Sequence, residues 1–293
     1  MVLPFRFGVN MMLPQSRGAW IEKCRRAEQL GYDVIGAPDH LGLPAPFPAL
    51  MLAADVTERV RLNTFVLNTP FYNPVLLARD VAGLDQLTDG RVELGLGAGY
   101  VQAEFEAAGI PFPTAGQRLT HLENTVTTLR RLFTDPEYQP QPATPGGPPI
   151  LIAGWGERML RLAAEHADII AFTGGGTADD GRIIVADSAT TEKKTDYARG
   201  LLGSRVGTVE FNILVQVVAT HAEHEEMLKS ISARMRSDFP DDPDGLPIAL
   251  LGSHQQMAET LIERRERFGF NYITVLEPNM DKLAPVIELL KAV

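Results

Sequence analysis

The sequence has 293 residues, of which 45% are hydrophobic and 22% charged, so it holds ample apolar material for one large core. Its formal net charge is −10, and no run of lysine and arginine is present. This charge argues against nucleic acid or an anionic membrane as the main partner and favours a small-molecule substrate.

Short apolar runs alternate with helical patterns through the first half of the chain. The predicted strands are residues 5–10, 34–37, 60–67 and 92–96, and the predicted helices are residues 20–30, 49–56, 74–87 and 118–132. Gly31 follows the first helix at a C-cap position, and Pro74 opens the third helix in its first turn. Strands that alternate with helices indicate a parallel sheet covered by helices.

The alternation resumes after a proline-rich segment at residues 136–149, which we interpret as a surface connection. The later predicted strands are residues 150–153, 169–172, 210–219 and 272–276. The later predicted helices are residues 157–166, 191–202, 222–235, 255–268 and 281–291. Residues 177–188 are poorly patterned, and residues 238–245 form an acidic turn.

Eight strands, each followed by a helix, favour a closed (β/α)8 TIM barrel over an open doubly wound sheet. We expect one domain over residues 1–293, with insertion segments around 100–116, 134–149 and 174–208. The active site of such a barrel lies at the carboxyl ends of its strands. The polar and glycine residues expected at this mouth are Asn10, Asp39, His40, Asn68, Gly97–Tyr100, Gly154–Gly156 and Gly174–Gly176.

The fourth strand ends in three alternating glycines, Gly95, Gly97 and Gly99, and Tyr100 then leads into a short helix. Glycine accepts positive φ and lets backbone N–H groups approach a ligand, so the cluster predicts contact with a flat or anionic group. The alternative is a tight strand-to-helix turn without a ligand. A dinucleotide fingerprint is not predicted, because the third glycine comes one residue too early.

Two further mouth segments suggest chemistry from their residues alone. His40 follows Asp39 at a strand end, where imidazole is suited to proton transfer, although a histidine that only caps or packs is the alternative. Gly154 and Gly156 precede a predicted helix whose N-terminal amides form an anion site. The histidine and glutamate residues at 221–226 are interpreted as a solvated helix start, and no metal site is predicted.

Several motifs together resemble the luciferase-like flavin and deazaflavin oxidoreductases, and they cover nearly the whole chain. They are the segments at residues 31–40, 73–79, 84–91, 95–100, 149–156 and 251–254. The chain looks closest to the branch that uses the deazaflavin coenzyme F420, partly because strand two ends in Pro38, Asp39 and His40.

This resemblance implies that the coenzyme ring lies across the barrel mouth, on a bulge with a non-proline cis peptide at Phe65–Val66. It implies that Asp39 hydrogen-bonds the ring and that His40 acts as an acid or base beside the transferred hydride. The remaining residues implied to bind the coenzyme are Gly97, Ala98 and Gly99 beside the ring, and Ala153, Gly154, Trp155 and Gly156 around its phosphate.

Tyr100 departs from the sugar-phosphate dehydrogenase branch, in which the matching residue is a glutamate that acts on the substrate. A buried tyrosine there would donate a proton or stack on the ring, so Tyr100 is a second catalytic candidate. Glu104 matches a glutamate that the family commonly keeps, and we interpret it as structural.

The predicted function is hydride transfer between F420 and a small organic substrate, with reduction of an activated double bond, imine or carbonyl favoured over alcohol oxidation. One alternative is an FMN-dependent monooxygenase, for which Arg158 is the nearest candidate phosphate ligand. Another is a non-catalytic flavin-binding barrel.

The cellular setting is predicted from cysteine content and hydropathy. Cys24 is the only cysteine, so no intramolecular disulfide can form, and a reducing cytoplasm is expected. Neither an N-terminal leader nor a run of about 20 apolar residues is present, so neither export nor a membrane span is expected. Apolar helix faces favour a homodimer.

Overall fold

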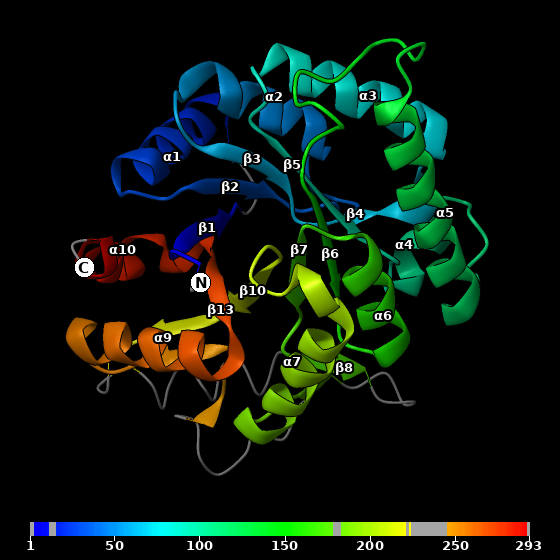
Figure 1. Cartoon of the computed structure of the whole chain (residues 1–293). Coiled ribbons are helices and arrows are strands. Elements are labelled where there is room, and N and C mark those ends of the chain that lie inside the picture. Colours follow the sequence, from blue (N-terminus) through cyan, green and yellow to red (C-terminus); the bar gives the residue numbers. More distant parts are fainter. Residues whose placement is uncertain (1–2, 12–15, 178–182, 221–222, 224–244, 292–293) are drawn as a thin grey trace.

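A closed barrel of parallel strands forms the centre of the protein (Figure 1). The computed structural model describes residues 3–11, 16–177, 183–220, 223 and 245–291. The eight barrel strands are β1 (Arg6–Asn10), β2 (Val34–Ala37), β3 (Arg61–Thr64), β5 (Val92–Gly97), β6 (Ile150–Gly154), β7 (Ile169–Phe172), β10 (Glu210–Val215) and β13 (Phe270–Leu276). Pairing of β3 with β5 and of β1 with β13 closes the ring, which confirms the predicted (β/α)8 fold.

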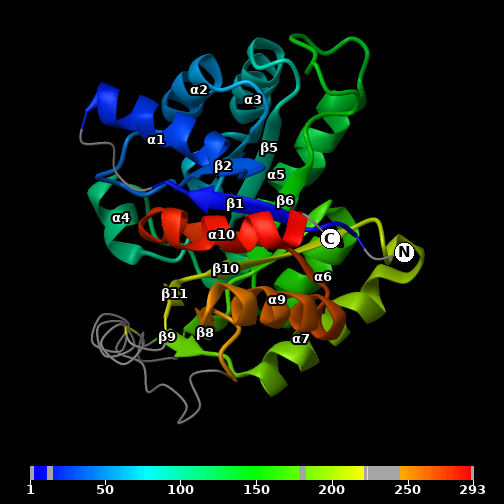
Figure 2. The same ribbon diagram turned by 90° about the vertical axis from the view of Figure 1, so that its left-hand side faces the viewer.

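Helices surround the barrel (Figure 1). They are α1 (Arg17–Gln29), α2 (Pro46–Val56), α3 (Pro74–Leu87), α5 (Ala115–Thr134), α6 (Glu157–His166), α7 (Ser188–Leu202), α9 (His254–Phe268) and α10 (Met280–Lys291). Short 3-10 turns occupy Thr69–Phe71, Gly203–Arg205 and Glu277–Asn279. In Figure 2 the strands point to the left, toward the short helix α4 (Gln102–Ala107), so the barrel mouth lies at that end.

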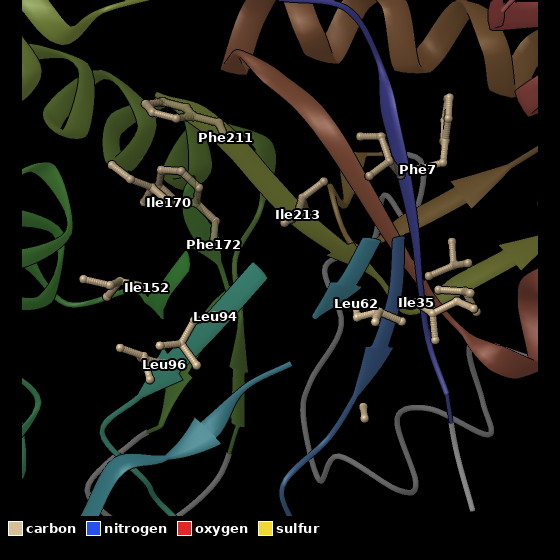
Figure 3. Packing of buried hydrophobic residues seen from close by; sticks show 14 of the residues in the cluster. Phe7, Ile35, Leu62, Leu94, Leu96, Ile152, Ile170, Phe172, Phe211 and Ile213 are labelled. Atoms are coloured by element: carbon tan, nitrogen blue, oxygen red, sulfur yellow. The ribbon is translucent and has the colours of Figure 1, made fainter. Parts of the chain in front are cut away.

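Alternation along each strand divides the buried residues into two groups. Side chains at every second position point outward and pack under the helices, as Figure 3 shows for Ile35, Leu94 and Ile170. The intervening positions point into the barrel, where Val34, Leu151, Ile169, Ala171 and Tyr272 form a separate smaller cluster. The outer layer therefore supplies most of the apolar core, and the interior is free to hold polar groups.

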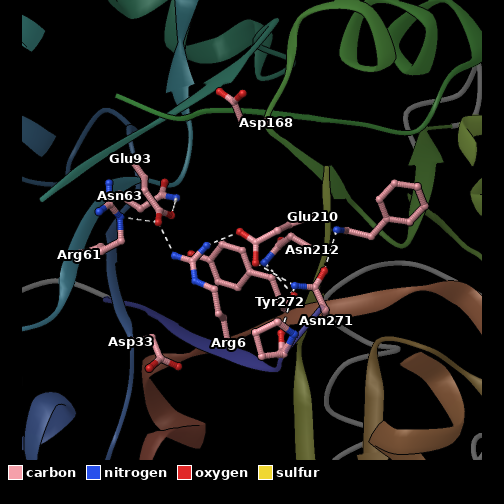
Figure 4. A network of polar contacts seen from close by, with 12 residues as sticks. Arg6, Asp33, Arg61, Asn63, Glu93, Asp168, Glu210, Asn212, Asn271 and Tyr272 are labelled. Carbon is pink, nitrogen blue, oxygen red and sulfur yellow. Dashed lines mark hydrogen bonds and ion pairs between the residues drawn. The ribbon is translucent and has the colours of Figure 1, made fainter. Parts of the chain in front are cut away.

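The end of the barrel interior opposite the mouth is filled by buried charges (Figure 4). Arg6 forms ion pairs with Glu93 and Glu210, and Nε of Arg61 lies 2.7 Å from Oε1 of Glu93. The Arg6 guanidinium also lies 4.7 Å from the centre of the Tyr272 ring. Burial lowers the pKa of Arg6, but Glu93, Tyr272 and Glu210 outweigh this effect and raise it overall. The charges neutralise one another inside the barrel.

The third predicted strand is interrupted near the mouth. Residues 60–67 were expected to be continuous, but β3 ends at Thr64, and β4 (Leu67–Asn68) resumes the pairing with β5. From Asn63 to Leu67 the chain advances four residues while β5 advances three, from Glu93 to Leu96. This extra residue is a β-bulge, and its Phe65–Val66 peptide bond is cis, as predicted.

Two other expectations about the strands need correction. Residues 210–219 form β10 and a separate β11 (Val217–Ala219), which leaves the barrel and pairs with β12 (Ala249–Leu251), a strand that was not predicted. The poorly patterned region at residues 177–188 contains β9 (Ile183–Val185), which pairs antiparallel with β8 (Gly175–Thr177) at its start to form a hairpin. The helix predicted at residues 222–235 and most of the acidic turn lie outside the described residues.

Candidate functional site

The loop after β2 brings the two residues at the centre of the predicted chemistry to the mouth of the barrel. Oδ2 of Asp39 accepts a hydrogen bond from the backbone N–H of Asn68 at 2.9 Å, and the Tyr72 hydroxyl donates to the same carboxyl group. Burial raises the pKa of Asp39, although both hydrogen bonds and the nearby His40 act in the opposite direction. Asp39 thus ties the β2 loop to the bulge after β3.

His40 is paired with a carboxylate from a different part of the chain. Its Nδ1 lies 2.8 Å from Oε1 of Glu104 on α4, and the side chains are 40% and 14% exposed, respectively. The Tyr100 ring meets the His40 ring edge-on, with centres 6.2 Å apart. Imidazole and carboxylate therefore form a dyad at the mouth, with the phenol beside it.

Tyr100 is not the buried tyrosine that the sequence suggested. The residue is 69% exposed. It follows Gly99, in the short connection between the end of β5 at Gly97 and the start of α4 at Gln102. Its place beside His40 keeps it at the mouth, but its ring does not fill the barrel interior.

Aromatic packing fixes α4, which carries Glu104. Phe105 is fully buried, and its ring lies 5.0 Å from the rings of both Phe71 and Phe112. Arg118 on α5 lies over Phe112 at 4.2 Å and donates to the carbonyl oxygen of Gly99 at 2.9 Å. The position of Glu104 is thereby set by its buried neighbour Phe105.

The glycines of β5 make room for the bulge. A Cβ on Gly95 would lie 1.9 Å from the Thr64 carbonyl oxygen, and one on Gly97 would lie 2.8 Å from Cγ2 of Val66. Gly99 has φ +71°, and a Cβ there would lie 2.1 Å from Oδ1 of Asn68. The space beside these glycines is occupied by the protein itself, so they shape the mouth by admitting Phe65–Val66. Contact with a ligand is not needed to explain them.

The loop between β6 and α6 is built differently. Helices α1, α3, α5, α7 and α9 begin with a side chain that accepts from a first-turn amide, whereas α2, α4 and α6 have no such cap. The N-cap residue of α6 is Gly156, which has no side chain to offer. A Cβ at Gly156 would meet nothing within 4 Å, while one at Gly154 would collide with Met159. The first-turn amides of α6 are therefore available to an anion at an open surface.

Trp155 packs against the barrel on one side and borders a cavity on the other. Its ring lies edge-on to Phe172, with centres 6.3 Å apart, and it also borders a cavity of about 160 Å³. The cavity is lined further by Gly175, Ile184, Val185, Ala186, Asp187 and Thr190, which belong to the β8–β9 hairpin and the start of α7. Ala153 and Gly154 are half-buried at the inner side of this loop.

The polar groups at the mouth, which include both acceptors and donors, fit a flat heterocycle with an anionic tail. Oδ1 of Asn10 and Oδ1 of Asn68 are buried without a hydrogen-bond partner at the ends of β1 and β4. Arg158, the candidate ligand for a flavin phosphate, lies with Nη2 3.1 Å from the Thr120 hydroxyl. The mouth thus provides an acid, a histidine dyad, unpartnered amide oxygens and an uncapped helix.

The pairing of Glu104 with His40 is the contact at the mouth that the sequence did not predict, and the interpretation of Glu104 as structural stays a prediction. A glutamate two turns from a strand end carries no local signal of pairing with a histidine 64 residues away.

No cluster of three or more potential metal ligands occurs within the described ranges. None of the helices in the described part of the chain is long and apolar enough to span a bilayer.

Comparison of the sequence with known proteins identifies a family and relatives that are named for F420. Residues 1–267 match the family described as luciferase-like monooxygenase. The chain is 36% identical over 185 residues to an F420-dependent glucose-6-phosphate dehydrogenase from Intrasporangium calvum, a match that covers 55% of this chain and 54% of the relative. The same enzyme from Beutenbergia cavernae is 27% identical over 304 residues, covering 88% of this chain and 87% of the relative.

The chain spans about half the length of the first of these relatives, 54%. Among solved structures, the coenzyme F420 dependent tetrahydromethanopterin reductase from Methanopyrus kandleri superposes with a TM-score of 0.75. It shares 17% sequence identity, and the match covers 97% of each chain. At this identity the likeness concerns the fold alone.

Proposed function

The chain belongs to the luciferase-like monooxygenase family, and we propose that it transfers a hydride between coenzyme F420 and a small organic substrate. The observation that carries the proposal is the dyad of His40 and Glu104 beside Asp39 at the barrel mouth. The F420-dependent relatives, one of which aligns with 88% of the chain, support the same coenzyme.

F420, when bound, accepts or donates a hydride at C5 of its deazaflavin ring. In the proposed arrangement, Phe65 and Val66 form the surface on which the ring rests, and Gly97, Ala98 and Gly99 form the wall beside it. Asp39 holds a polar edge of the ring. Ala153, Gly154, Trp155 and Gly156 hold the phosphate, because α6 starts there without a cap.

His40 moves the proton that accompanies the hydride. A hydride carries two electrons and one proton, so reduction of a C=C, C=N or C=O group needs one further proton, which the imidazolium of His40 supplies. In the opposite direction the neutral imidazole accepts that proton from a hydroxyl or amine. We favour reduction, because Tyr100 stands where the sugar-phosphate branch has a glutamate that acts on its substrate.

Two rival functions share the fold, an FMN-dependent monooxygenase and a non-catalytic flavin-binding barrel. They differ from the proposed function in what they require of the phosphate site and of the dyad. An FMN-dependent monooxygenase needs a clamp on a terminal phosphate, and Arg158 is hydrogen-bonded toward Thr120 and Gly116 on α5. A non-catalytic flavin-binding barrel has no use for a histidine paired with a carboxylate at its mouth. The dyad therefore favours an enzyme.

The phosphate site is tested by a pair of substitutions at Gly156. Its φ of −70° and ψ of 150° suit any residue, and a Cβ there meets open space. In Gly156→Asp the new carboxylate caps the first-turn amides of α6 and repels the phosphate, so the Kd for F420 should rise at least ~10-fold while thermal stability stays equal or increases. Fluorescence titration and thermal melting measure the two effects.

The control is Gly156→Ala, which leaves the amides free and should change the Kd by no more than about two-fold. If Gly156→Asp binds F420 as tightly as the wild type, the coenzyme phosphate does not lie at the start of α6. Turnover is tested separately, by following the absorbance of reduced F420 with a panel of enones, imines and ketones.

A further inference from the structure

The hydrogen bond between Glu104 and His40 bears on which nitrogen of the imidazole carries the proton. The Glu104 carboxylate, when ionised, only accepts hydrogen bonds, so Nδ1 of His40 at 2.8 Å must carry a proton. In the neutral ring Nε2 is then the unprotonated nitrogen. We propose that Glu104 is a positioning residue that holds His40 in the Nδ1–H tautomer and leaves Nε2 as the atom that exchanges protons with the substrate.

Glu104 is suited to this role because it is fixed independently of His40. The next residue, Phe105, is fully buried between Phe71 and Phe112. Arg118 anchors both ends of the segment 99–113, which contains α4, since it donates to the carbonyl oxygens of Gly99 and Pro113. The carboxylate is 14% exposed, so water competes weakly for the His40 proton.

The other groups near His40 leave this pairing undisturbed. Asp39, the adjacent residue, accepts hydrogen bonds from the Asn68 amide and the Tyr72 hydroxyl. Tyr100 presents its ring edge-on to the imidazole, with ring centres 6.2 Å apart, which is an aromatic packing contact. Among the described residues, the acceptor at hydrogen-bond distance from Nδ1 is Oε1 of Glu104.

The tautomer can be measured in the free protein, without coenzyme or substrate. In a chain labelled with 15N-histidine, the His40 signal, assigned by its loss in His40→Ala, should show a protonated Nδ1 and an unprotonated Nε2 above the titration range of the imidazole. In Glu104→Ala this tautomer should no longer dominate. The matched control is Glu106→Ala on the same helix, because Glu106 is exposed and accepts a hydrogen bond from Gln102, so its loss should leave the His40 signals unchanged.

The catalytic consequence rests on the proposed function and is tested by rates. Glu104→Ala removes the partner that orients His40. Its single-turnover rate of hydride transfer should therefore fall by about 10- to 100-fold, with little change in the Kd for the coenzyme. In the His40→Ala background, Glu104→Ala should cause no further loss of this rate, because Glu104 acts through His40. A further loss of the same size there would show that Glu104 acts on substrate or structure directly.

The two experiments separate the possible failures. If F420 does not bind at all, the proposed function fails, while the tautomer measurement still stands or falls alone. An Nε2–H tautomer in the wild-type protein, or an Nδ1–H tautomer that persists in Glu104→Ala, would overturn the positioning role.

Discussion

A His40→Ala variant is expected to bind F420 with an unchanged Kd and to lose most of its turnover. A positioned general acid or base typically contributes 10²- to 10⁴-fold to the rate, so kcat should fall by roughly that factor. The coenzyme contacts proposed above involve other residues, and the His40 side chain is 40% exposed, so its removal leaves little buried space. Single-turnover absorbance of F420 at saturating substrate measures the effect.

The matched control is His166→Ala. His166 lies at the C-terminal end of α6, far along the barrel axis from the mouth. Its Nε2 lies 3.7 Å from Oε1 of the exposed Glu165, and its backbone carbonyl oxygen accepts a hydrogen bond from Arg130. Its loss should leave kcat and the Kd for F420 near the wild-type values. If both histidine variants turn over at the wild-type rate, His40 is not the proton partner.

Glu93→Ala is expected to cause the largest loss of stability. Glu93 is 1% exposed inside the barrel and pairs with both Arg6 and Arg61. Among the described residues, its removal leaves Arg6 paired with Glu210 and removes the carboxylate that pairs with Arg61. Breaking a buried ion pair costs about 3–5 kcal/mol in the free energy of unfolding, so the melting temperature should fall by on the order of 10 °C.

A surface ion pair of the same chemistry provides the comparison. Arg79 and Asp80 lie on α3 at a distance of 2.8 Å, with side chains 61% and 42% exposed. Asp80→Ala should cost no more than about 1 kcal/mol, because water and salt screen exposed pairs. Equal melting temperatures for Glu93→Ala and Asp80→Ala would contradict the assignment of Glu93 as the centre of the interior charge network.

Much of the fold was predictable because its signals are local. Helices α3 and α6 and strands β2 and β7 begin and end at the expected residues, since proline, glycine and apolar alternation mark them within the sequence. The end of β10 was not predictable in this way. The N–H groups of Gln216 and Val217 both donate to the carbonyl oxygen of Ile248, a partner more than 30 residues away. Non-local pairing of this kind leaves no periodic trace.

The candidate site was predicted in part. The location of the site could be predicted, because strand ends meet at one mouth in any barrel of this type, and Asp39 and His40 lie there as expected. The contacts between side chains could not be predicted, as the pairing of Glu104 with His40 and the exposure of Tyr100 show. The neighbours of Gly95, Gly97 and Gly99 are Thr64, Val66 and Asn68 of this chain, and the contact of Gly97 and Gly99 with the coenzyme stays a prediction. The homodimer and the cytoplasmic location stay predictions.

The central claim is that this barrel uses F420, and fluorescence titration of the purified protein with F420 and, separately, with FMN tests it most directly. Since the uncapped start of α6 and the Asp39 side chain are proposed to hold the deazaflavin coenzyme, F420 should bind with a Kd in the micromolar range or below. FMN should bind much more weakly. Micromolar binding of FMN with no binding of F420 would contradict the account and favour the monooxygenase.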